Sequence, residues 1–313
     1  MDFSDATDHL NKVVTNIGDV IRGQEDTIKL LVAAFIAGGH VLMEDVPGTG
    51  KTTLAKSFAK SVDLGFQRIQ FTPDLLPSDI LGVNIYDQSR GEFIMHKGAI
   101  FTDILLADEI NRASPRTQSA LLEAMAEKQV SIERELNRLS DNFFVIATQN
   151  PVESHGTYPL PEAQMDRFFI KIKLGYIEAE EEVTVLSQMI EQHPVELLQS
   201  VVSASEITEI IDVVKKVRIS EEIKHYIVDI VSKTRSYSGV LLGASPRASI
   251  AMLKMAQACS LINGEDFVTP DIIQELVGPV IAHRITLDQQ QVFSGNSAEK
   301  VLDKIIAEIA VPA

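Results

Sequence analysis

Apolar residues form short runs in the first part of the chain, and their spacing predicts β-strands. The runs are His40–Glu44, Phe66–Phe71, Ile104–Ala107, Phe143–Thr148 and Phe168–Leu174. The third and fourth are almost continuously apolar, which is typical of inner parallel strands that are covered on both faces. The last run alternates apolar and polar residues, so we expect one of its faces to be wetter. Helical patterns between several runs indicate crossover helices, and together they predict an α/β fold with a parallel sheet.

The second part of the chain has a different pattern, because the strand signals stop near Ile177. Helical patterns follow over 178–192, 205–217, 220–235, 246–262 and 270–284. Ser245-Pro246 and Thr269-Pro270 are typical helix starts, as is Ser114-Pro115 earlier in the chain, since the hydroxyl can cap the helix and proline suits its first turn. A length of 313 residues suits two domains. We therefore predict an α/β domain over residues 1–177 and a helical domain over residues 178–313.

A glycine-rich segment lies between the first strand and an amphipathic helix. Residues 44–52 read EDVPGTGKT. Gly48 and Gly50 let backbone N–H groups curl around phosphates, and the helix that follows points its positive end at the same anion. Lys51 supplies a charge to the β and γ phosphates, and the Thr52 hydroxyl can ligate Mg²⁺. The candidate nucleotide contacts in this loop are Val46, Pro47, Gly48, Thr49, Gly50, Lys51, Thr52 and Thr53.

One position of this loop departs from the general pattern, which has glycine where this chain has Asp45. An acid near phosphates is repulsive, so we expect the Asp45 side chain to point away from them. A chance lysine in a glycine-rich turn is the alternative interpretation of the whole segment. The order of strand, loop and helix favours the phosphate loop.

Polar residues follow the third and fourth strands, where ligands bind in open α/β sheets. Asp108 can hold the Mg²⁺ that Thr52 also contacts, and Glu109 can polarise the water that attacks the γ-phosphate. Asn150 follows the next strand and could orient that water. Taken alone, the acids could be an ordinary cap of a buried strand, and Asn150-Pro151 a common turn pair.

Two arginines complete the candidate set. Arg167 lies at a helix-to-strand junction, from which an arginine can reach into a neighbouring subunit's site and neutralise charge in the transition state. Arg247 lies near a helix start, where a cation is unfavourable for the helix dipole, and this suggests a phosphate as its target. The alternatives are a surface arginine at a helix end for Arg167 and a solvated side chain for Arg247.

Charge and composition narrow the class of protein. The formal net charge is −16 with a pI near 4.9, which argues against nucleic acid as the main partner. The chain has neither an apolar run of about 18 residues nor a basic-then-apolar N-terminus, so we expect no transmembrane segment and no secretory signal. The single cysteine, Cys259, lies in an apolar helical stretch and is expected to be a buried small hydrophobe. These features suit a cytoplasmic protein.

Together the motifs resemble those of the AAA+ ATPases, and more narrowly the MoxR family. The segments that carry the resemblance, in addition to the phosphate loop, are Gly98–Phe101, Leu105–Ala113, Thr117–Met125, Ala147–Pro151, Pro161–Phe168 and Gly243–Arg247. The resemblance implies an AAA+ P-loop NTPase core with a five-stranded parallel sheet, followed by an all-α helical lid. It also implies an extra insertion near residues 75–100, where Val83–Tyr86 and Glu92–Met95 could pair as a hairpin, and a second hairpin near Val130–Arg138. Such loops face the ring pore in this branch, although ordinary surface hairpins are an equal alternative.

The resemblance also implies a role for each matched residue. Lys51 and Thr52 correspond to Walker A, Asp108 and Glu109 to Walker B, Asn150 to sensor 1, Arg167 to the arginine finger and Arg247 to sensor 2, while Gln24 belongs to the segment that passes the adenine. The expected cofactors are ATP and Mg²⁺.

The expected function is hydrolysis of ATP to ADP and phosphate in a ring of identical subunits, with a hexamer as the expected size. The resemblance implies a chaperone-like role in maturing or metal-loading partner proteins, often with a separate von Willebrand factor A domain protein. One alternative is a magnesium-chelatase-like or helicase-like motor subunit. Another is a nucleotide-gated adaptor that assembles but barely hydrolyses ATP.

Overall fold

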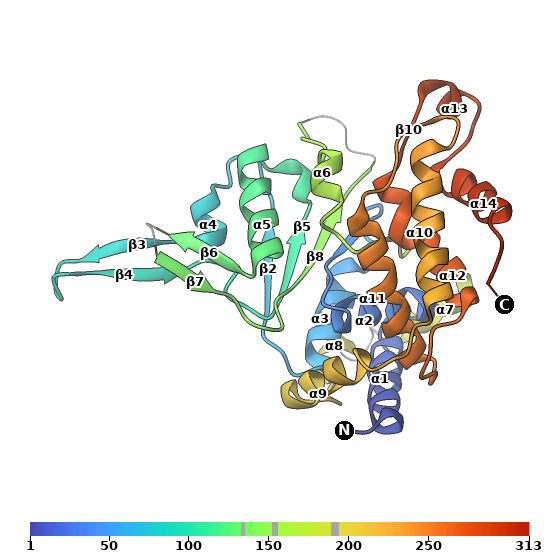
Figure 1. The fold of residues 1–313 in the computed structure, drawn as a ribbon. Helices are drawn as coiled ribbons and strands as arrows, with labels where there is room; N and C mark the ends of the chain where they lie inside the picture. Colours follow the sequence, from blue (N-terminus) through green and yellow to red (C-terminus); the bar gives the residue numbers. More distant parts are fainter. Residues whose placement is uncertain (133–134, 152–155, 189–193, 313) are drawn as a thin grey trace.

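The computed structural model describes residues 1–132, 135–151, 156–188 and 194–312, and these include all of the predicted strands. The strands are β1 (Val41–Glu44), β2 (Phe66–Gln70), β5 (Ile104–Asp108), β8 (Phe144–Gln149) and β9 (Ile170–Ile172). They form one five-stranded sheet in the order β2-β5-β8-β1-β9, and every pairing is parallel (Figure 1). The predicted α/β sheet is therefore confirmed, and the carboxyl ends of its strands meet at one edge.

Two apolar clusters cover the two faces of this sheet. Along β5, Leu105 and Ala107 point into one cluster while Ile104 and Leu106 point into the other. Successive residues of a strand face opposite sides, so an inner strand that is covered twice must be apolar at every position. This explains why β5 and nearly all of β8 are buried, as their continuous apolar runs predict.

Helices pack on both faces of the sheet. They are α1 (Phe3–Gly18), α2 (Glu25–Ile36), α3 (Lys51–Ser61), α4 (Pro77–Leu81), α5 (Pro115–Glu127) and α6 (Glu162–Met165), with a 3₁₀ turn η1 (Ile110–Arg112). The predicted start of α5 is confirmed, since the Ser114 hydroxyl caps it by accepting from the Thr117 N–H. The helices α1 and α2 were not predicted from the sequence. The signal was present in α1, where Leu10, Val14 and Ile17 recur at helical spacing and are buried.

Two antiparallel hairpins project from the sheet layer, on the side away from the lid (Figure 1). The first pairs β3 (Gly82–Asp87) with β4 (Glu92–Lys97), which confirms the predicted pairing of Val83–Tyr86 with Glu92–Met95. The second pairs β6 (Gln129–Ile132) with β7 (Glu135–Arg138); the predicted span Val130–Arg138 also contains residues 133–134, which lie outside the described residues. Apolar side chains on both hairpins are exposed, with Phe93 at 67% and Leu136 at 68%.

The lid is helical, as predicted. Its helices are α7 (Ala179–Gln188), α8 (Pro194–Leu197), α9 (Ala204–Val214), α10 (Glu221–Ser236), α11 (Pro246–Ile262), α12 (Pro270–Ile281), α13 (Gln289–Phe293) and α14 (Ala298–Glu308), with a 3₁₀ turn η2 (Ala282–Arg284). The predicted helix 178–192 reaches Gln188, and residues 189–193 lie outside the described residues. The helices α8, α13 and α14 were not predicted.

Some details of the lid differ from the expectation of a purely helical domain. The strands β10 (Val240–Leu242) and β11 (Thr286–Leu287) pair antiparallel, a contact between distant short segments that leaves no periodic signal in the sequence. Both predicted proline starts are confirmed, although the Thr269 side chain makes no capping hydrogen bond. In α11, Cys259 is partly buried against the core rather than fully buried as expected, and desolvation raises the pKa of its thiol to about 12. One apolar cluster joins lid helices α10, α11 and α12 to α1, α2 and one face of the sheet, so the lid rests on the N-terminal helices. Within the described ranges, no helix is both long enough and apolar enough to cross a membrane.

Candidate active site

The glycine-rich segment forms a tight loop between β1 and α3. Gly48 and Gly50 have φ values of 88° and 91°, in the left-handed region that favours glycine, and Gly50 is the residue that precedes the first turn of α3. The Lys51 ammonium folds back over the loop and donates to the carbonyl oxygens of Asp45 at 3.0 Å and Val46 at 2.6 Å. The loop backbone, the start of α3 and this cation therefore face one place, as phosphate binding requires.

Asp45 points away from that place, as expected. Its side chain is buried and does not line the cleft beside the loop. One carboxylate oxygen accepts from the Val46 N–H at 2.8 Å, and the other accepts from the N–H groups of Leu174 at 3.0 Å and Gly175 at 2.7 Å. Asp45 thus fastens the start of the phosphate loop to the chain that leaves β9, where its charge is met by backbone donors.

The two acids after β5 are oriented by a threonine from β8. The Thr148 hydroxyl donates to Asp108 Oδ1 at 2.6 Å and accepts from the Glu109 N–H at 2.9 Å. Glu109 has a φ of 57°, an unusual backbone conformation for a residue with a side chain. Its Oε2 accepts from Gln70 Nε2 at 2.7 Å and lies 3.0 Å from Arg112 Nε. This network fixes the directions of both carboxylates at the sheet edge.

An arginine from β2 meets the first of these acids. Arg68 donates from Nε at 3.1 Å and from Nη2 at 2.7 Å to Asp108 Oδ2. The Arg68 side chain is 45% exposed while that of Asp108 is 12% exposed, so the acid is the better shielded partner. Asp108 therefore has a cation beside it at the position where the sequence predicts a metal ligand.

These groups line one cleft of about 380 Å³ at the carboxyl ends of the strands. Its lining residues are Pro47, Gly48, Gly50, Lys51, Thr52, Thr53, Arg68, Gln70, Asp108, Glu109, Thr148, Gln149 and Asn150. Most of the predicted loop contacts, both acids and Asn150 are thus brought together from the ends of three separate strands, β1, β5 and β8. Asn150 is buried, and its carbonyl oxygen accepts from Asn111 Nδ2 at 3.4 Å.

Four polar residues of this cleft were not predicted as site residues, namely Arg68, Gln70, Thr148 and Gln149. The first two are two positions apart on β2 and so share a face, which is a detectable pattern, although it gains meaning only once β2 is known to pair with β5. Thr148 lies inside a predicted strand, where its hydroxyl gave no separate signal.

A second hollow of about 400 Å³ continues from the loop toward α2 and the chain after β9. Predicted residues Gln24 and Thr49 line it, together with Tyr176 and Ile177, which the sequence did not single out. Val46 is not among the described residues that line the two hollows. Its carbonyl oxygen accepts hydrogen bonds from the Lys51 ammonium and, at 3.3 Å, from the Thr49 hydroxyl. An aromatic ring and aliphatic side chains beside a phosphate loop suit a flat apolar group such as a nucleobase.

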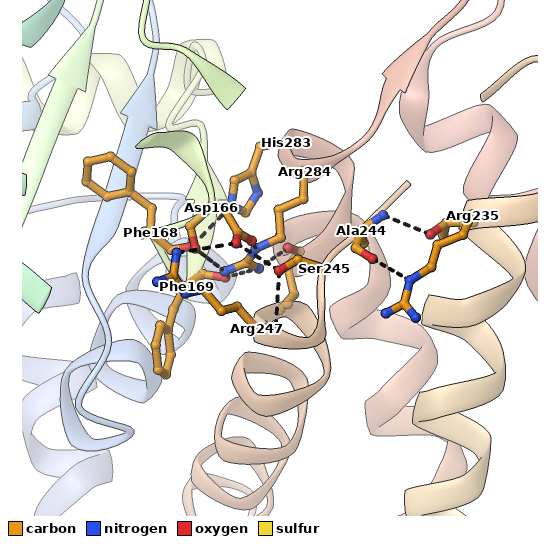
Figure 2. A network of polar contacts seen from close by, with 11 residues as sticks. Asp166, Phe168, Phe169, Arg235, Ala244, Ser245, Arg247, His283 and Arg284 are labelled. Atoms are coloured by element: carbon orange, nitrogen blue, oxygen red, sulfur yellow. Dashed lines mark hydrogen bonds and ion pairs between the residues drawn. The ribbon is translucent and has the colours of Figure 1, made fainter. Parts of the chain in front are cut away.

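The two predicted arginines lie elsewhere. Neither Arg167 nor Arg247 is among the described residues that line either hollow. Arg167 donates to the carbonyl oxygen of Leu122 in α5. The Arg247 side chain is 62% exposed, and its Nη1 lies 3.8 Å from Asp166 Oδ2 (Figure 2). Within one chain, the structure therefore separates these arginines from the cleft that the other predicted residues share.

The donors of the cleft fit Mg²⁺ better than a metal held by protein alone. No group of three or more His, Cys, Asp or Glu side chains in the described part of the chain could hold a metal ion by itself. The cleft offers the hydroxyl of Thr52 and the carboxylate of Asp108, both hard oxygen donors. Mg²⁺ keeps several waters and binds through one or two protein oxygens together with substrate phosphates. Thr52 and Asp108 supply two such protein oxygens.

Comparison with known proteins places these features in a family context. Residues 40–170 match the family described as "ATPase family associated with various cellular activities (AAA)", and residues 232–305 match the "AAA lid domain". The Bacillus subtilis protein YeaC is 49% identical over 303 residues, which cover 97% of this chain and 95% of YeaC. Chaperone MoxR1 of Mycobacterium tuberculosis is 37% identical over 97% of this chain and 82% of its own length. A Cytophaga hutchinsonii crystal structure, of a protein proposed to be an ATPase, is 40% identical with a TM-score of 0.93 and covers 99% of this chain and 97% of its own.

Proposed function

The chain belongs to the MoxR family of AAA+ ATPases, and from that premise we propose that it hydrolyses ATP to ADP and phosphate in a ring of identical subunits. The observation that carries the proposal is the cleft at the sheet edge, where the phosphate loop, two acids and an amide meet. A hexamer is the ring size that the family resemblance implies. The domain boundary that we propose lies between residues 177 and 178, ahead of the first lid helix α7.

Within one subunit, we assign each lining residue a step. Lys51 binds the β and γ phosphates, and its present carbonyl partners show that the ammonium already lies at the loop. Thr52 and Asp108 would hold Mg²⁺, which offsets phosphate charge when it is bound. Glu109 polarises the attacking water and Asn150 orients it. Gln24 lies in the hollow suited to the base.

The two arginines complete the ATP site in this proposal. Arg167 lies outside its own subunit's cleft, which supports a role in the site of a neighbouring subunit. There it would neutralise charge in the transition state, an effect of about 10³- to 10⁵-fold in turnover for arginines of this kind. Arg247 contributes from the lid as the second phosphate-directed arginine.

The work done with ATP is remodelling of partner proteins. Exposed apolar side chains on both hairpins, such as Phe93 and Leu136, suit contact with another protein, since such patches commonly mark interaction sites. We propose chaperone-like maturation, including metal loading, of client proteins in the cytoplasm, with a separate von Willebrand factor A domain protein as a partner. The acidic net charge of −16 supports protein rather than nucleic acid as the client.

The first test is phosphate release from ATP over a range of protein concentrations. Specific activity should rise with concentration if sites are shared between subunits. Glu109→Gln should bind ATP without turning it over, and Lys51→Ala should not bind ATP. Wild-type turnover no higher than that of Glu109→Gln, with ATP binding intact, would favour the adaptor or a need for a partner.

A second test addresses the shared site. Arg167→Ala should be inactive alone, and mixing it with Lys51→Ala should restore activity, because some interfaces then combine an intact loop with an intact arginine. Mixed rings that stay inactive would contradict a site shared between subunits.

A further inference from the structure

Side chains of the lid bind the segment that carries Arg167. This residue follows Asp166 in the short connection between α6 and β9. Arg284, in the η2 turn after α12, inserts a side chain that is only 1% exposed. Its Nε donates to Asp166 Oδ1 at 2.9 Å, and its terminal nitrogens donate to the carbonyl oxygens of Phe168 at 2.6 Å and Phe169 at 3.1 Å (Figure 2). The buried Arg284 guanidinium therefore binds the backbone that follows Arg167 and the Asp166 side chain that precedes it.

The second oxygen of the same carboxylate is bound by another lid helix. Asp166 Oδ2 accepts from the Ser245 hydroxyl at 2.8 Å, and that hydroxyl caps α11 by accepting from the Arg247 N–H at 3.1 Å. The preceding residue, Ala244, is fastened to α10 through its carbonyl oxygen, which accepts from Arg235 Nε at 2.8 Å. The start of α11 is thus fixed within the lid, and Asp166 connects it to the segment of Arg167.

The opposite charges of Arg284 and Asp166 stabilise one another in this cluster. Burial lowers the pKa of Arg284 to about 10, and the neighbouring Asp166 carboxylate opposes that change, so the guanidinium keeps its charge near neutral pH. His283 adds a contact to the Phe168 carbonyl at 3.2 Å, and burial holds the pKa of its imidazole well below the ordinary value. Separating a buried ion pair leaves an uncompensated charge, which is strongly unfavourable. The lid therefore cannot move away from this segment without breaking the pair or taking the segment with it.

We propose that Asp166 is a positioning residue through which the lid sets the place of Arg167 in the neighbouring subunit's site. The inference rests on the proposed function, because it needs a site shared between subunits. Arg247 Nη1 lies 3.8 Å from the same carboxylate, so the residue that directly precedes Arg167 also faces the lid arginine. A lid that moves when nucleotide binds in its own subunit would thereby change the position of Arg167 in the neighbouring subunit's site.

Ser245→Ala is the sharpest variant, because it removes the link between Asp166 and α11 while leaving the Arg284 pair intact. The matched control is Ser220→Ala, which removes the equivalent cap of α10, where the Ser220 hydroxyl accepts from the Ile223 N–H. We expect Ser245→Ala to bind ATP as tightly as wild type but to lose about threefold to tenfold in turnover at saturating ATP, since small displacements of a catalytic group are costly. Ser220→Ala should keep wild-type turnover. Asp166→Asn should show a larger loss in the same direction, and Ser245→Ala carries the test if Asp166→Asn does not fold.

Mixed rings separate positioning from mere support. Adding Lys51→Ala subunits to Ser245→Ala should restore turnover, because they supply a correctly held Arg167 to the intact clefts. Equal losses in Ser245→Ala and Ser220→Ala would overturn the inference, as would an unrestored loss in mixtures where Arg167→Ala is restored. Mixtures of Arg167→Ala and Lys51→Ala that stay inactive would instead overturn the shared site, and the inference with it.

Discussion

Replacing Arg68 by methionine should raise the preference of the cleft for ATP with Mg²⁺ over ATP alone. Arg68 places two N–H groups, at 3.1 and 2.7 Å, on the one carboxylate oxygen Asp108 Oδ2. A carboxylate oxygen has two lone pairs, so this oxygen is fully used by the guanidinium. A cation that binds Asp108 through Oδ2 must compete with Arg68, and the variant removes the competitor.

The size of the effect follows from the exposure of the pair. Arg68 is 45% exposed, so the pair is screened by solvent and contributes about 1 kcal/mol, the upper end of the range for exposed pairs. Since about 1.4 kcal/mol corresponds to a tenfold change in affinity, the expected change is about fivefold. The measured quantity is the ratio of the ATP dissociation constant in EDTA to that in Mg²⁺, from titration calorimetry or a fluorescent ATP analogue with Glu109→Gln as the common background.

Loss of any cation near the phosphates also weakens the binding of metal-free ATP, because that form carries more negative charge than ATP with Mg²⁺. A matched variant measures this loss of electrostatic attraction separately. Arg112→Met removes a cation that lies 3.0 Å from Glu109 with a similar exposure of 38%. The ratio should rise by about fivefold more in Arg68→Met than in Arg112→Met. Equal ratios in the two variants would refute competition for Asp108.

Three further outcomes are expected, two for the free energy of unfolding and one for ATP binding. Asp45→Ala should lower the free energy of unfolding by about 2–3 kcal/mol in urea denaturation, because one buried and two partly buried N–H groups lose their charged acceptor, whereas a change below about 0.5 kcal/mol would contradict that account. The same variant should weaken ATP binding in calorimetry, since the start of the loop is no longer fastened to the end of β9. Burial lowers the pKa of His40 to about 4, so the unfolded chain binds the proton more readily, and stability that is complete above pH 6.5 should fall by about 2 kcal/mol at pH 5. His40→Gln should remove that part of the pH dependence in urea denaturation at pH 7 and pH 5, and an unchanged dependence would exclude His40 as its source.

The local motifs were readable from the sequence because their contacts are local. The loop places Lys51 against the carbonyl oxygens of Asp45 and Val46, only six and five residues away. The strands β5 and β8 were predicted because burial on both faces requires apolar residues at every position. The acids after β5 then reach the loop because parallel strands end at the same edge of the sheet.

Other residues were beyond prediction because their partners are distant in the chain. Gln70 lies opposite Asp108 only through the pairing of β2 with β5, which brings it to Glu109 across 39 positions. The helix α1 carried a readable apolar pattern, but its role in joining the lid to the sheet depends on packing with α2 and α11.

The sequence by itself therefore determined the α/β core, the helical lid, both hairpins and the glycine-rich loop between β1 and α3, since each depends on short-range periodicity or on a motif of contiguous residues. Tertiary structure alone decided which groups share the cleft, which N–H groups after β9 meet Asp45, and that Arg167 and Arg247 lie outside it. It also decided that Arg284 meets Asp166 across 118 positions of the chain. A buried charge needs a specific partner in space, and no local pattern in the sequence names that partner.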